Sequence, residues 1–272
     1  MKVLVIGTSG FLGKTVYHLL KEAGNDVIGT YNSKPVDGMQ QLDVLDVESL
    51  ISILESSQPD AIIWTVMNHN LEEEIADKVM PKLCQHIGAA RLIFLSTSVA
   101  LEEKMSEDVT PLIRTSDMYN YHYFNGKIKS EKVIQNLENY CIVRPGSIYG
   151  INPYGEMDVR SKALKEHLDS GEEYVRADNI IFSIVEVNEL AAAIVELISS
   201  DYVGVLNISE EQPVSHYEFN KALCSLHGWD DSCIVPNQEK ECIYYLDNSR
   251  RKQVLESEIL GKLKHSHYPK EK

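Results

Sequence analysis

The first thirteen residues restrict the fold of this chain more than any other stretch. Lys2–Ile6 is a short apolar run rich in β-branched residues, which predicts a buried strand. It ends at Gly7-Thr8-Ser9-Gly10-Phe11-Leu12-Gly13, and apolar residues then recur at helical spacing at Leu12, Val16, Leu19 and Leu20. The sequence therefore predicts a strand, a tight glycine turn and a helix in direct succession.

Glycines spaced three apart suit such a turn for a physical reason. A residue without Cβ adopts unusual φ values and lets another group approach the backbone closely. The helix that follows offers N–H groups and the positive end of its dipole, which together favour an anion. Tight turns also need glycine, but the whole arrangement favours a nucleotide site over a structural turn. We expect its contacts to come from Gly7, Ser9, Gly10, Phe11, Leu12 and Gly13.

Further short apolar runs alternate with helical patterns up to residue 150. Strands are predicted at Asp26–Thr30, Leu42–Val44, Ala61–Thr65, Arg91–Leu95 and Tyr140–Arg144. Helices are predicted between them at Val47–Leu54, Leu71–His86 and Tyr119–Leu137. This alternation predicts an α/β fold, a Rossmann-type doubly wound parallel sheet that binds its ligand beyond the carboxyl ends of the strands.

Beyond Gly150 the pattern becomes more polar and irregular. Helices are expected at Asp158–Leu168, Glu189–Ile198 and His216–His227, strands near Glu173–Arg176, Ile180–Ile184 and Val205–Ile208, and a fraying, charged tail over Lys262–Lys272. The helix at 189–198 is apolar enough for burial on the main domain. We therefore expect an NAD(P)-binding Rossmann domain at 1–150. A smaller C-terminal substrate lobe would cover most of 151–272, with some segments returning to the core.

Composition excludes several kinds of partner. With 26 Lys and Arg against 41 Asp and Glu, the net charge is −15, which argues against a nucleic acid. No apolar run approaches the length of a membrane span, and the apolar start is too short for a signal peptide. The five cysteines form no CxxC pair, so we expect reduced thiols in a cytoplasmic protein. The sequence leaves a homodimer open.

The end of the second strand indicates which dinucleotide binds. Such sites often carry an acid about 20 residues after the glycines, where it holds the adenosine ribose. Here the chain reads Tyr31-Asn32-Ser33-Lys34, whose hydroxyl and cation suit the extra phosphate of NADP. We therefore predict NADP, with NAD as the alternative if Lys34 is only a solvated loop charge. Asp43 either accepts from the adenine amino group or caps its turn. The other predicted cofactor contacts are Val44, Val66, Met67, Tyr123, Lys127 and Pro145.

Tyr123 and Lys127 are candidates for chemistry. They stand four residues apart on a predicted helix, so they share one face. An ammonium beside a phenol lowers the pKa of that phenol, which makes Tyr123 a competent proton donor to a carbonyl being reduced. The same spacing is common on exposed helices. Thr97, at the end of the fifth strand, has a hydroxyl that suits the substrate oxygen opposite Tyr123. Ser96 and Ser98 compete for that role, and all three also suit a plain strand-end turn.

These motifs, in this order, resemble the extended short-chain dehydrogenase/reductase family. The resemblance rests on Gly7-x-x-Gly10-x-x-Gly13, Ser96-Thr97, Tyr123-x-x-x-Lys127 with Glu131 after it, and Arg144-Pro145-Gly146-Ser147-Ile148-Tyr149-Gly150. Two later stretches are most similar to the dTDP-4-dehydrorhamnose reductase branch, namely Gly204–Ser209 and Leu246–Arg250.

The resemblance implies an NAD(P)-dependent oxidoreductase that reduces the keto group of a nucleotide-linked 4-keto-6-deoxy sugar. Thr97 and Tyr123 would polarise and protonate that group, and Lys127 would bind the nicotinamide ribose. The nicotinamide carboxamide would rest near Pro145-Gly146. The C-terminal lobe would hold the sugar nucleotide, with Ser98 and Arg250 as substrate contacts. Asn248-Ser249 would otherwise cap a helix.

The chain departs from that branch at two loops. Ser98-Val99-Ala100-Leu101 replaces the usual Asp-Tyr-Val-Phe, and Val66-Met67-Asn68-His69 replaces a small, alanine-rich stretch. Two alternatives therefore stay open. One is an NADP-binding regulatory subunit without turnover, similar to that of methionine adenosyltransferase, and the other is an epimerase or dehydratase of the same family. His69 and the His265-x-His267 pair lack a third ligand, so no metal site is predicted.

Overall fold

The computed structural model describes residues 1–98, 104–240 and 242–263, and it divides the chain into two compact units. The first unit comprises Met1–Ala100, Asp108–Arg144 and Ala191–Leu206. The second comprises Leu101–Glu107, Pro145–Leu190 and Asn207–Lys272. Each unit is thus assembled from segments that are distant in the sequence. The loop 99–101, the His265-x-His267 pair and the tail from residue 264 lie outside the described residues.

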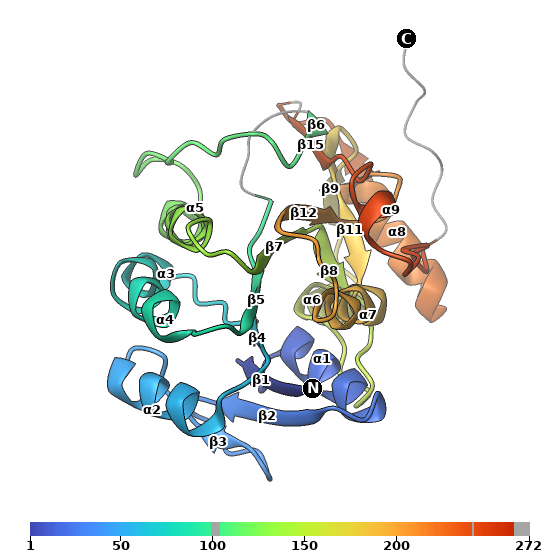
Figure 1. Ribbon diagram of the computed structural model, residues 1–272. Coiled ribbons are helices and arrows are strands. Elements are labelled where there is room, and N and C mark those ends of the chain that lie inside the picture. Colours follow the sequence, from blue (N-terminus) through green and yellow to red (C-terminus); the bar gives the residue numbers. More distant parts are fainter. Residues whose placement is uncertain (99–103, 241, 264–272) are drawn as a thin grey trace. The chain divides into compact units, whose positions relative to one another are not determined.

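A seven-stranded sheet dominates the first unit, in the order β12-β7-β5-β4-β1-β2-β3 (Figure 1). The strands are β1 (Lys2–Ile6), β2 (Asp26–Tyr31), β3 (Gln40–Gln41), β4 (Ala61–Trp64), β5 (Arg91–Leu95), β7 (Tyr140–Pro145) and β12 (Gly204–Ile208). All pairs from β3 to β7 are parallel. The strand order reverses at β1, which is the pattern of a Rossmann-type doubly wound sheet and confirms the predicted fold class.

Helices cover both faces of this sheet (Figure 1). On one face lie α2 (Val47–Ser57), α3 (Glu72–Glu74), the π-helical turn η1 (Ile75–Val79), α4 (Met80–His86) and α5 (Tyr121–Ile134). On the other lie α1 (Phe11–Glu22) and α7 (Val187–Leu197). One core cluster packs Leu50, Leu83 and Ile134 from the first set of helices with Trp64 and Phe94 of the sheet. Every residue of β4 is buried, as expected for a strand covered on both faces.

The structure corrects the prediction for the third strand. We predicted Leu42–Val44, whereas β3 is Gln40–Gln41. Leu42 N still donates to Tyr31 O at 2.8 Å, but Asp43 Oδ1 then accepts from Leu45 N at 3.1 Å. A short polar side chain that bonds to its own backbone in this way competes with strand pairing, and so it turns the chain. Asp43 therefore does cap its turn, one of the two roles predicted for it.

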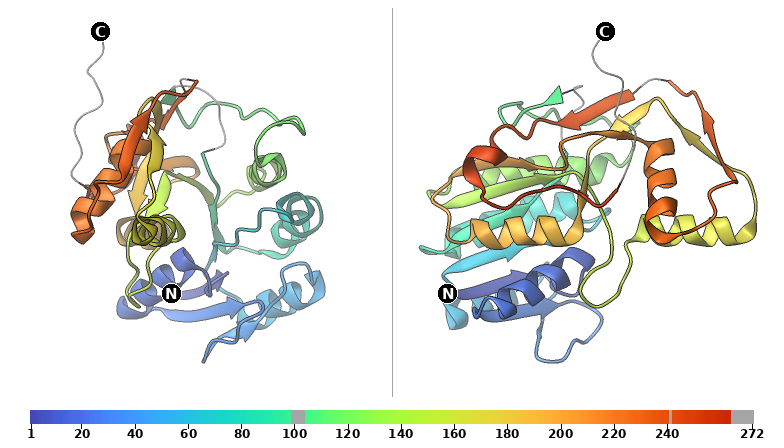
Figure 2. Two further views of the ribbon diagram at one scale, coloured as in Figure 1. Left: turned by 180° about the vertical axis from the view of Figure 1, so that it is seen from behind. Right: turned by 90° about the vertical axis from the view of Figure 1, so that its right-hand side faces the viewer.

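The second unit is built from small sheets and three helices among its described residues. Its sheets have the orders β13-β10-β15-β6, β11-β8 and β14-β9. Their strands are β6 (Lys104–Met105), β8 (Ser147–Tyr149), β9 (Tyr174–Ala177), β10 (Ile180–Phe182), β11 (Ile184–Glu186), β13 (Val214–Ser215), β14 (Ile234–Asn237) and β15 (Cys242–Leu246). The helices are α6 (Val159–Ser170), α8 (His216–His227) and α9 (Arg251–Val254), which are yellow, orange and red in Figure 2. A separate apolar cluster around Tyr149, Phe182 and Phe219 forms the core of this unit.

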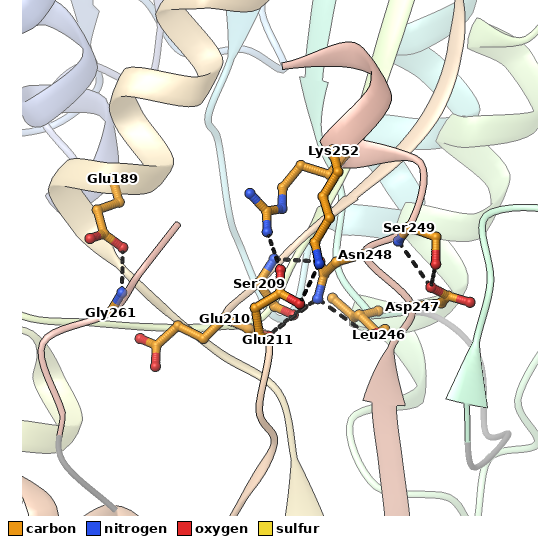
Figure 3. A network of polar contacts seen from close by, with 11 residues as sticks. Glu189, Ser209, Glu210, Glu211, Leu246, Asp247, Asn248, Ser249, Lys252 and Gly261 are labelled. Carbon is orange, nitrogen blue, oxygen red and sulfur yellow. Dashed lines mark hydrogen bonds and ion pairs between the residues drawn. The ribbon is translucent and has the colours of Figure 1, made fainter. Parts of the chain in front are cut away.

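Asn248 joins two stretches of the second unit (Figure 3). Its Oδ1 accepts from Ser209 N at 3.0 Å, and its Nδ2 donates to Ser209 Oγ at 2.8 Å and to Glu210 O at 3.2 Å. The N-cap residue of α9 is Arg250, which makes no side-chain cap hydrogen bond. The helix-cap alternative for Asn248 is therefore wrong. This residue instead ties together the two stretches that resemble the reductase branch.

Glu210 belongs to a buried group of carboxylates in the same unit. It is 5% exposed, and its Oε1 accepts from Tyr149 Oη at 2.7 Å. The same Oη accepts from Lys262 N at 2.9 Å. Burial raises the pKa of Glu210 to about 7; the hydrogen bond from Tyr149 opposes this shift, and the carboxylates of Glu189 and Glu186 add to it. Burial therefore disfavours the charged form of the Glu210 carboxyl near neutral pH.

Glu210 makes stability depend on pH. Its pKa is 4.5 without the fold and about 7 within it, so the folded state binds more protons between these values. The free energy of unfolding should thus fall by about 3 kcal/mol as the pH rises through this window. Glu210→Gln keeps an acceptor for Tyr149 and should remove the fall, so that it exceeds the wild type in stability at pH 8. Urea unfolding at pH 5 and pH 8 measures this, with the exposed Glu258→Gln as control. Equal pH slopes for Glu210→Gln and the wild type would refute it.

In the described ranges, no helix is both long enough and apolar enough to cross a membrane, and no three His, Cys, Asp or Glu side chains are grouped to hold a metal ion. The five cysteines carry free thiols. Burial raises the pKa of Cys141 to about 12 and that of Cys84 to about 11. Neither thiol is a ready nucleophile at neutral pH.

Candidate active site

The glycine turn between β1 and α1 has no room for a side chain at two of its positions. Gly7 has a φ of +93°, and Gly10 N donates to Gly7 O at 3.0 Å. A Cβ built on Gly13 would lie 2.3 Å from Gly7 O. Glycine is therefore needed at position 7 for the backbone conformation and at position 13 for the close approach of helix and turn.

Threonines from the neighbouring strands hold this turn in place. Gly7 N donates to Thr30 Oγ1 at 3.1 Å, and Thr30 N donates to Thr8 Oγ1 at 3.1 Å, which ties the turn to β2. From just beyond β4, Thr65 Oγ1 donates to Ile6 O at 3.0 Å. The turn thus lies at the end of β1, between β2 and β4, where the strand order reverses and such sheets bind ligands.

The helix that follows begins without a side-chain cap. Its N-cap residue is Gly10, which makes no side-chain cap hydrogen bond, and its first turn contains no acid. The positive end of the helix dipole is therefore left for an anion from a ligand. Together with the bare glycine backbone, this fits the pyrophosphate of a dinucleotide. Of the other predicted contacts in the turn, Ser9 and Phe11 are half-buried and Leu12 is buried.

The chain beyond β2 is open to solvent. Tyr31 is half-buried, and Asn32, Ser33 and Lys34 are exposed. Thr30, which anchors the glycine turn, directly precedes them. The cation of Lys34 therefore stands exposed on the loop that follows β2. Of the other predicted cofactor contacts, Asp43 is exposed, Val44 packs on the core, and Met67 is 61% exposed.

Lys127 is fixed between the ends of two strands. It is 1% exposed, and its Nζ donates to Val66 O at 2.9 Å and to Leu95 O at 3.2 Å. Val66 follows β4 and Leu95 ends β5. One helical turn earlier, Tyr123 is 9% exposed, and its ring centroid lies 5.9 Å from Lys127 Nζ. The structure thus brings together Tyr123, Lys127 and Val66 at the carboxyl ends of the strands.

Glu72 belongs to this site, and the sequence analysis missed it. The residue is fully buried, and its Oε1 lies 3.3 Å from Lys127 Nζ and accepts from Asn68 N at 2.9 Å. The other oxygen, Oε2, is buried without a hydrogen-bond partner. Glu72 opens the acidic run 72–74, a pattern typical of an exposed helix start. No signal in the sequence distinguishes it from the two acids after it.

Glu72 and Lys127 can meet because α5 carries a glycine where it crosses α3. A Cβ built on Gly126 would lie 2.2 Å from the backbone carbon of Glu72 and 2.5 Å from its backbone oxygen. These are backbone atoms, so no flexible side chain can move aside. Gly126 is therefore required for the contact between the two helices.

We expect Gly126→Ala to lower the free energy of unfolding by about 1–3 kcal/mol, because overpacking must push α5 away from α3. The same displacement should move Lys127 and weaken cofactor binding. Thermal unfolding and NADPH titration measure the two effects. Ser130→Ala is the matched control, since Ser130 Oγ lies buried on the same helix without a hydrogen-bond partner. Its stability should match or exceed that of the wild type. A Gly126→Ala protein as stable as this control would contradict the packing argument.

Three polar residues follow β5. Ser96 is hydrogen-bonded within the protein, whereas Thr97 and Ser98 are partly exposed. Ser96 is 3% exposed, and its Oγ donates to Glu131 Oε1. The Glu131 carboxylate also accepts from Arg144 Nε at 3.1 Å and from Arg144 Nη2 at 2.7 Å. The hydroxyl of Ser96 is thus engaged away from any substrate. Thr97 and Ser98 are half-buried and remain the candidates for a substrate contact.

Two predicted site residues belong to the second unit. Pro145 is buried and ends β7. Arg250 Nε lies 4.0 Å from Glu107 Oε2, and Glu107 is 7% exposed. Burial raises the pKa of the Glu107 carboxyl. The guanidinium of Arg250 therefore has a carboxylate beside it, which would compete with a substrate phosphate.

Comparison with known proteins places this arrangement in a family. Residues 3–208 match the model of the NAD dependent epimerase/dehydratase family. The probable low-salt glycan biosynthesis reductase Agl14 of Haloferax volcanii is 19% identical over 86% of this chain and 83% of its own length. A hypothetical dTDP-4-dehydrorhamnose reductase from Sulfolobus tokodaii superposes with a TM-score of 0.77 at 21% identity, covering 96% of this chain and 97% of its own.

Other solved structures of this fold belong to proteins named for different reactions. The UDP-glucose 4-epimerase of Thermotoga maritima, solved with UDP-glucose, has a TM-score of 0.74 at 21% identity, covering 95% of this chain and 94% of its own. Structures of this fold have been solved with NAD+ and with NADP. The family match covers the glycine turn, the Tyr123–Lys127 helix and the strand ends around them. This chain therefore belongs to the NAD-dependent epimerase/dehydratase family, a group of extended short-chain dehydrogenase/reductases.

Proposed function

We propose that the protein is an NADPH-dependent reductase of the keto group of a nucleotide-linked 4-keto-6-deoxy sugar. One observation carries the proposal. Tyr123 and Lys127 are both buried on one face of α5, and the Lys127 ammonium is bonded to the carbonyl groups of Val66 and Leu95 at the strand ends. A phenol and a fixed ammonium at the cofactor edge of a Rossmann-type sheet are the groups that carbonyl reduction needs.

Each residue has a separate task in this proposal. Bound NADPH supplies the hydride to the keto carbon. Tyr123 gives its phenol proton to the keto oxygen, and Thr97 donates a hydrogen bond to the same oxygen. Lys127 would place its positive charge beside the nicotinamide ribose, and that charge would stabilise the phenolate form of Tyr123. Glu72, through its contact of 3.3 Å, keeps the ammonium in position.

The choice of reaction within the family rests on the relatives and on the protein's own acids and bases. The Haloferax relative and the Sulfolobus structure bear reductase names. Glu72, the carboxylate next to Lys127, is ion-paired and fully buried, so it does not suit the second acid–base role that a dehydratase needs. An epimerase or dehydratase of the same family is the alternative reaction.

The substrate assay decides between these functions. Purified protein is mixed with NADPH and dTDP-4-keto-6-deoxyglucose or another 4-keto nucleotide sugar, and the reduced-nicotinamide absorbance is followed. A fall that depends on the sugar supports the reductase. Conversion of a nucleotide sugar in a parallel assay with NAD+, detected by chromatography without net change in the dinucleotide, would indicate an epimerase or dehydratase. NADPH binding without any turnover would indicate a regulatory subunit.

Lys34 should decide the preference for NADP in this proposal. Its exposed ammonium suits the extra phosphate, and an ionic hydrogen bond contributes about 1.5–3 kcal/mol. Lys34→Met should therefore weaken NADPH binding by about tenfold or more and leave NADH binding unchanged. Fluorescence titration with both cofactors measures this, and Lys21→Met in the last turn of α1 is the charge-matched control. Equal losses for NADPH and NADH would mean that Lys34 does not contact the extra phosphate.

A further inference from the structure

His69 lies against the proposed catalytic tyrosine. It belongs to the loop between β4 and α3, and its ring centroid is 5.0 Å from that of Tyr123, with 42° between the ring planes. The imidazole is exposed, whereas the tyrosine is buried. From the sequence we assigned this histidine no role, because it lacks the further ligands of a metal site. The structure instead places a second polar ring beside the phenol that would protonate the substrate.

Asn120 holds this histidine. The Nδ2 of Asn120 lies 2.8 Å from His69 Nδ1. Asn120 is the N-cap residue of α5 and has a left-handed backbone, with φ of 54° and ψ of 34°, yet its side chain makes no cap hydrogen bond. An asparagine at an N-cap usually bonds to the first turn of its own helix. Here the amide reaches across to the β4 loop instead.

This contact selects one tautomer of the imidazole. With the amide nitrogen of Asn120 facing Nδ1 of His69, as it does here, Nδ1 accepts the hydrogen bond with its lone pair. In a neutral imidazole the proton then sits on Nε2. His69 thereby presents an N–H donor from a ring that packs beside the Tyr123 hydroxyl-bearing ring.

We propose that His69 Nε2–H donates a hydrogen bond to a substrate oxygen next to the reacting carbonyl, and that Asn120 is the positioning residue that fixes its tautomer. The inference rests on the proposed function and deepens it. Two donors on adjacent rings suit two adjacent oxygens, which is the arrangement of an α-hydroxy ketone in a sugar. His69 would thus select a keto sugar with a free hydroxyl beside the keto carbon over a simple ketone.

Four variants test this assignment by steady-state kinetics. Loss of one neutral hydrogen bond should reduce kcat/KM by about tenfold in His69→Ala, and by less in His69→Gln, whose amide can still donate. Asn120→Asp is close to isosteric, and its carboxylate would accept from Nδ1–H. At an alkaline pH where the ring carries a single proton, this puts the lone pair on Nε2, so the variant should lose as much as His69→Ala. Asn120→Gly suits the left-handed backbone and removes only the amide, so its loss should be about threefold.

Two controls separate this role from a structural one. NADPH affinity and thermal unfolding should stay close to wild type in all four variants. With an analogue that lacks the hydroxyl beside the keto group, the wild type and His69→Ala should have equal kcat/KM. Full activity of Asn120→Asp at that alkaline pH would overturn the proposal. So would a ratio of wild-type to His69→Ala kcat/KM that is the same for the analogue as for the keto sugar.

A direct readout of the tautomer does not depend on turnover. Long-range ¹H–¹⁵N spectra of histidine-labelled protein, with His69→Gln to assign the signal, should show Nε2–H in the wild type and Nδ1–H in Asn120→Asp. An Nδ1–H signal in the wild type would refute the inference even if the enzyme is a reductase. If no keto sugar is turned over, the proposed function fails. The tautomer signal, and loss of nucleotide-sugar affinity in His69→Ala by calorimetry, then test the inference by themselves.

Discussion

Replacing Tyr123 with phenylalanine is expected to reduce kcat by about 10²–10⁴-fold, the usual contribution of a positioned general acid. The hydride can still be delivered, but the keto oxygen then has no phenol from which to take its proton. Affinity for NADPH should remain within about twofold of wild type, because the glycine turn and the chain after β2 are untouched. Single-turnover kinetics with NADPH and a 4-keto nucleotide sugar measure the step itself.

The local packing should accept phenylalanine at position 123, so that the substitution removes only the hydroxyl. Tyr123 is 9% exposed and packs edge-on to Phe124, with ring centroids 5.4 Å apart, so a phenylalanine ring occupies the same space. Tyr121→Phe is the matched control, since Tyr121 lies on the same helix and is only half-buried. It should keep the wild-type rate. A Tyr123→Phe enzyme that retains full turnover would show that another group protonates the substrate.

Glu131→Ala should produce the largest loss of stability, about 3–5 kcal/mol, because it leaves the Arg144 guanidinium buried without its counter-charge. Glu131 and Arg144 are 2% and 3% exposed, and they form two hydrogen bonds at 2.7 and 3.1 Å. The expected fall in Tm is roughly 6–20 °C for a protein of this size. Calorimetry or thermal unfolding followed by circular dichroism measures it.

A double variant separates the charge from the fold. Glu131→Leu with Arg144→Met removes both charges and fills the space with apolar atoms, so it should recover most of the loss. Ser96→Ala, which deletes only the hydroxyl donor to Glu131, should cost about 1 kcal/mol. If Glu131→Ala and the double variant were equally unstable, packing volume rather than the unpaired charge would explain the effect.

The parts of this protein that could be predicted from sequence depend on local patterns. A few neighbouring residues are enough to define each short apolar strand, each helical repeat and the glycine turn. The parallel sheet could therefore be predicted from them. The third strand was misplaced because the Asp43 side chain accepts a hydrogen bond from Leu45 N, and the pattern of hydrophobic residues does not reveal such a bond. The proximity of Tyr123 and Lys127, the proposed proton donor and its lysine, could be predicted because four-residue spacing on a helix defines a shared face.

The contacts around that pair could not be predicted. Glu72 reads as one acid of an exposed run, and its burial against Lys127 follows only from Gly126, which removes the side chain that would keep α3 and α5 apart. The pairing of Asn120 with His69 joins residues 51 positions apart. It also depends on a left-handed backbone at an asparagine that the sequence allows but does not demand.

The amino-acid sequence by itself therefore determined the strand–turn–helix at Gly7 to Gly13, the Rossmann-type sheet and the tyrosine and lysine on α5. Tertiary structure alone decided which partners these residues have: Glu72 for Lys127, His69 for Tyr123, and Glu131 rather than a substrate for Ser96. The physical reason is the separation in sequence over which each interaction acts. Backbone conformation and helical facing are set by near neighbours, whereas the burial of a charge depends on every segment that packs over it.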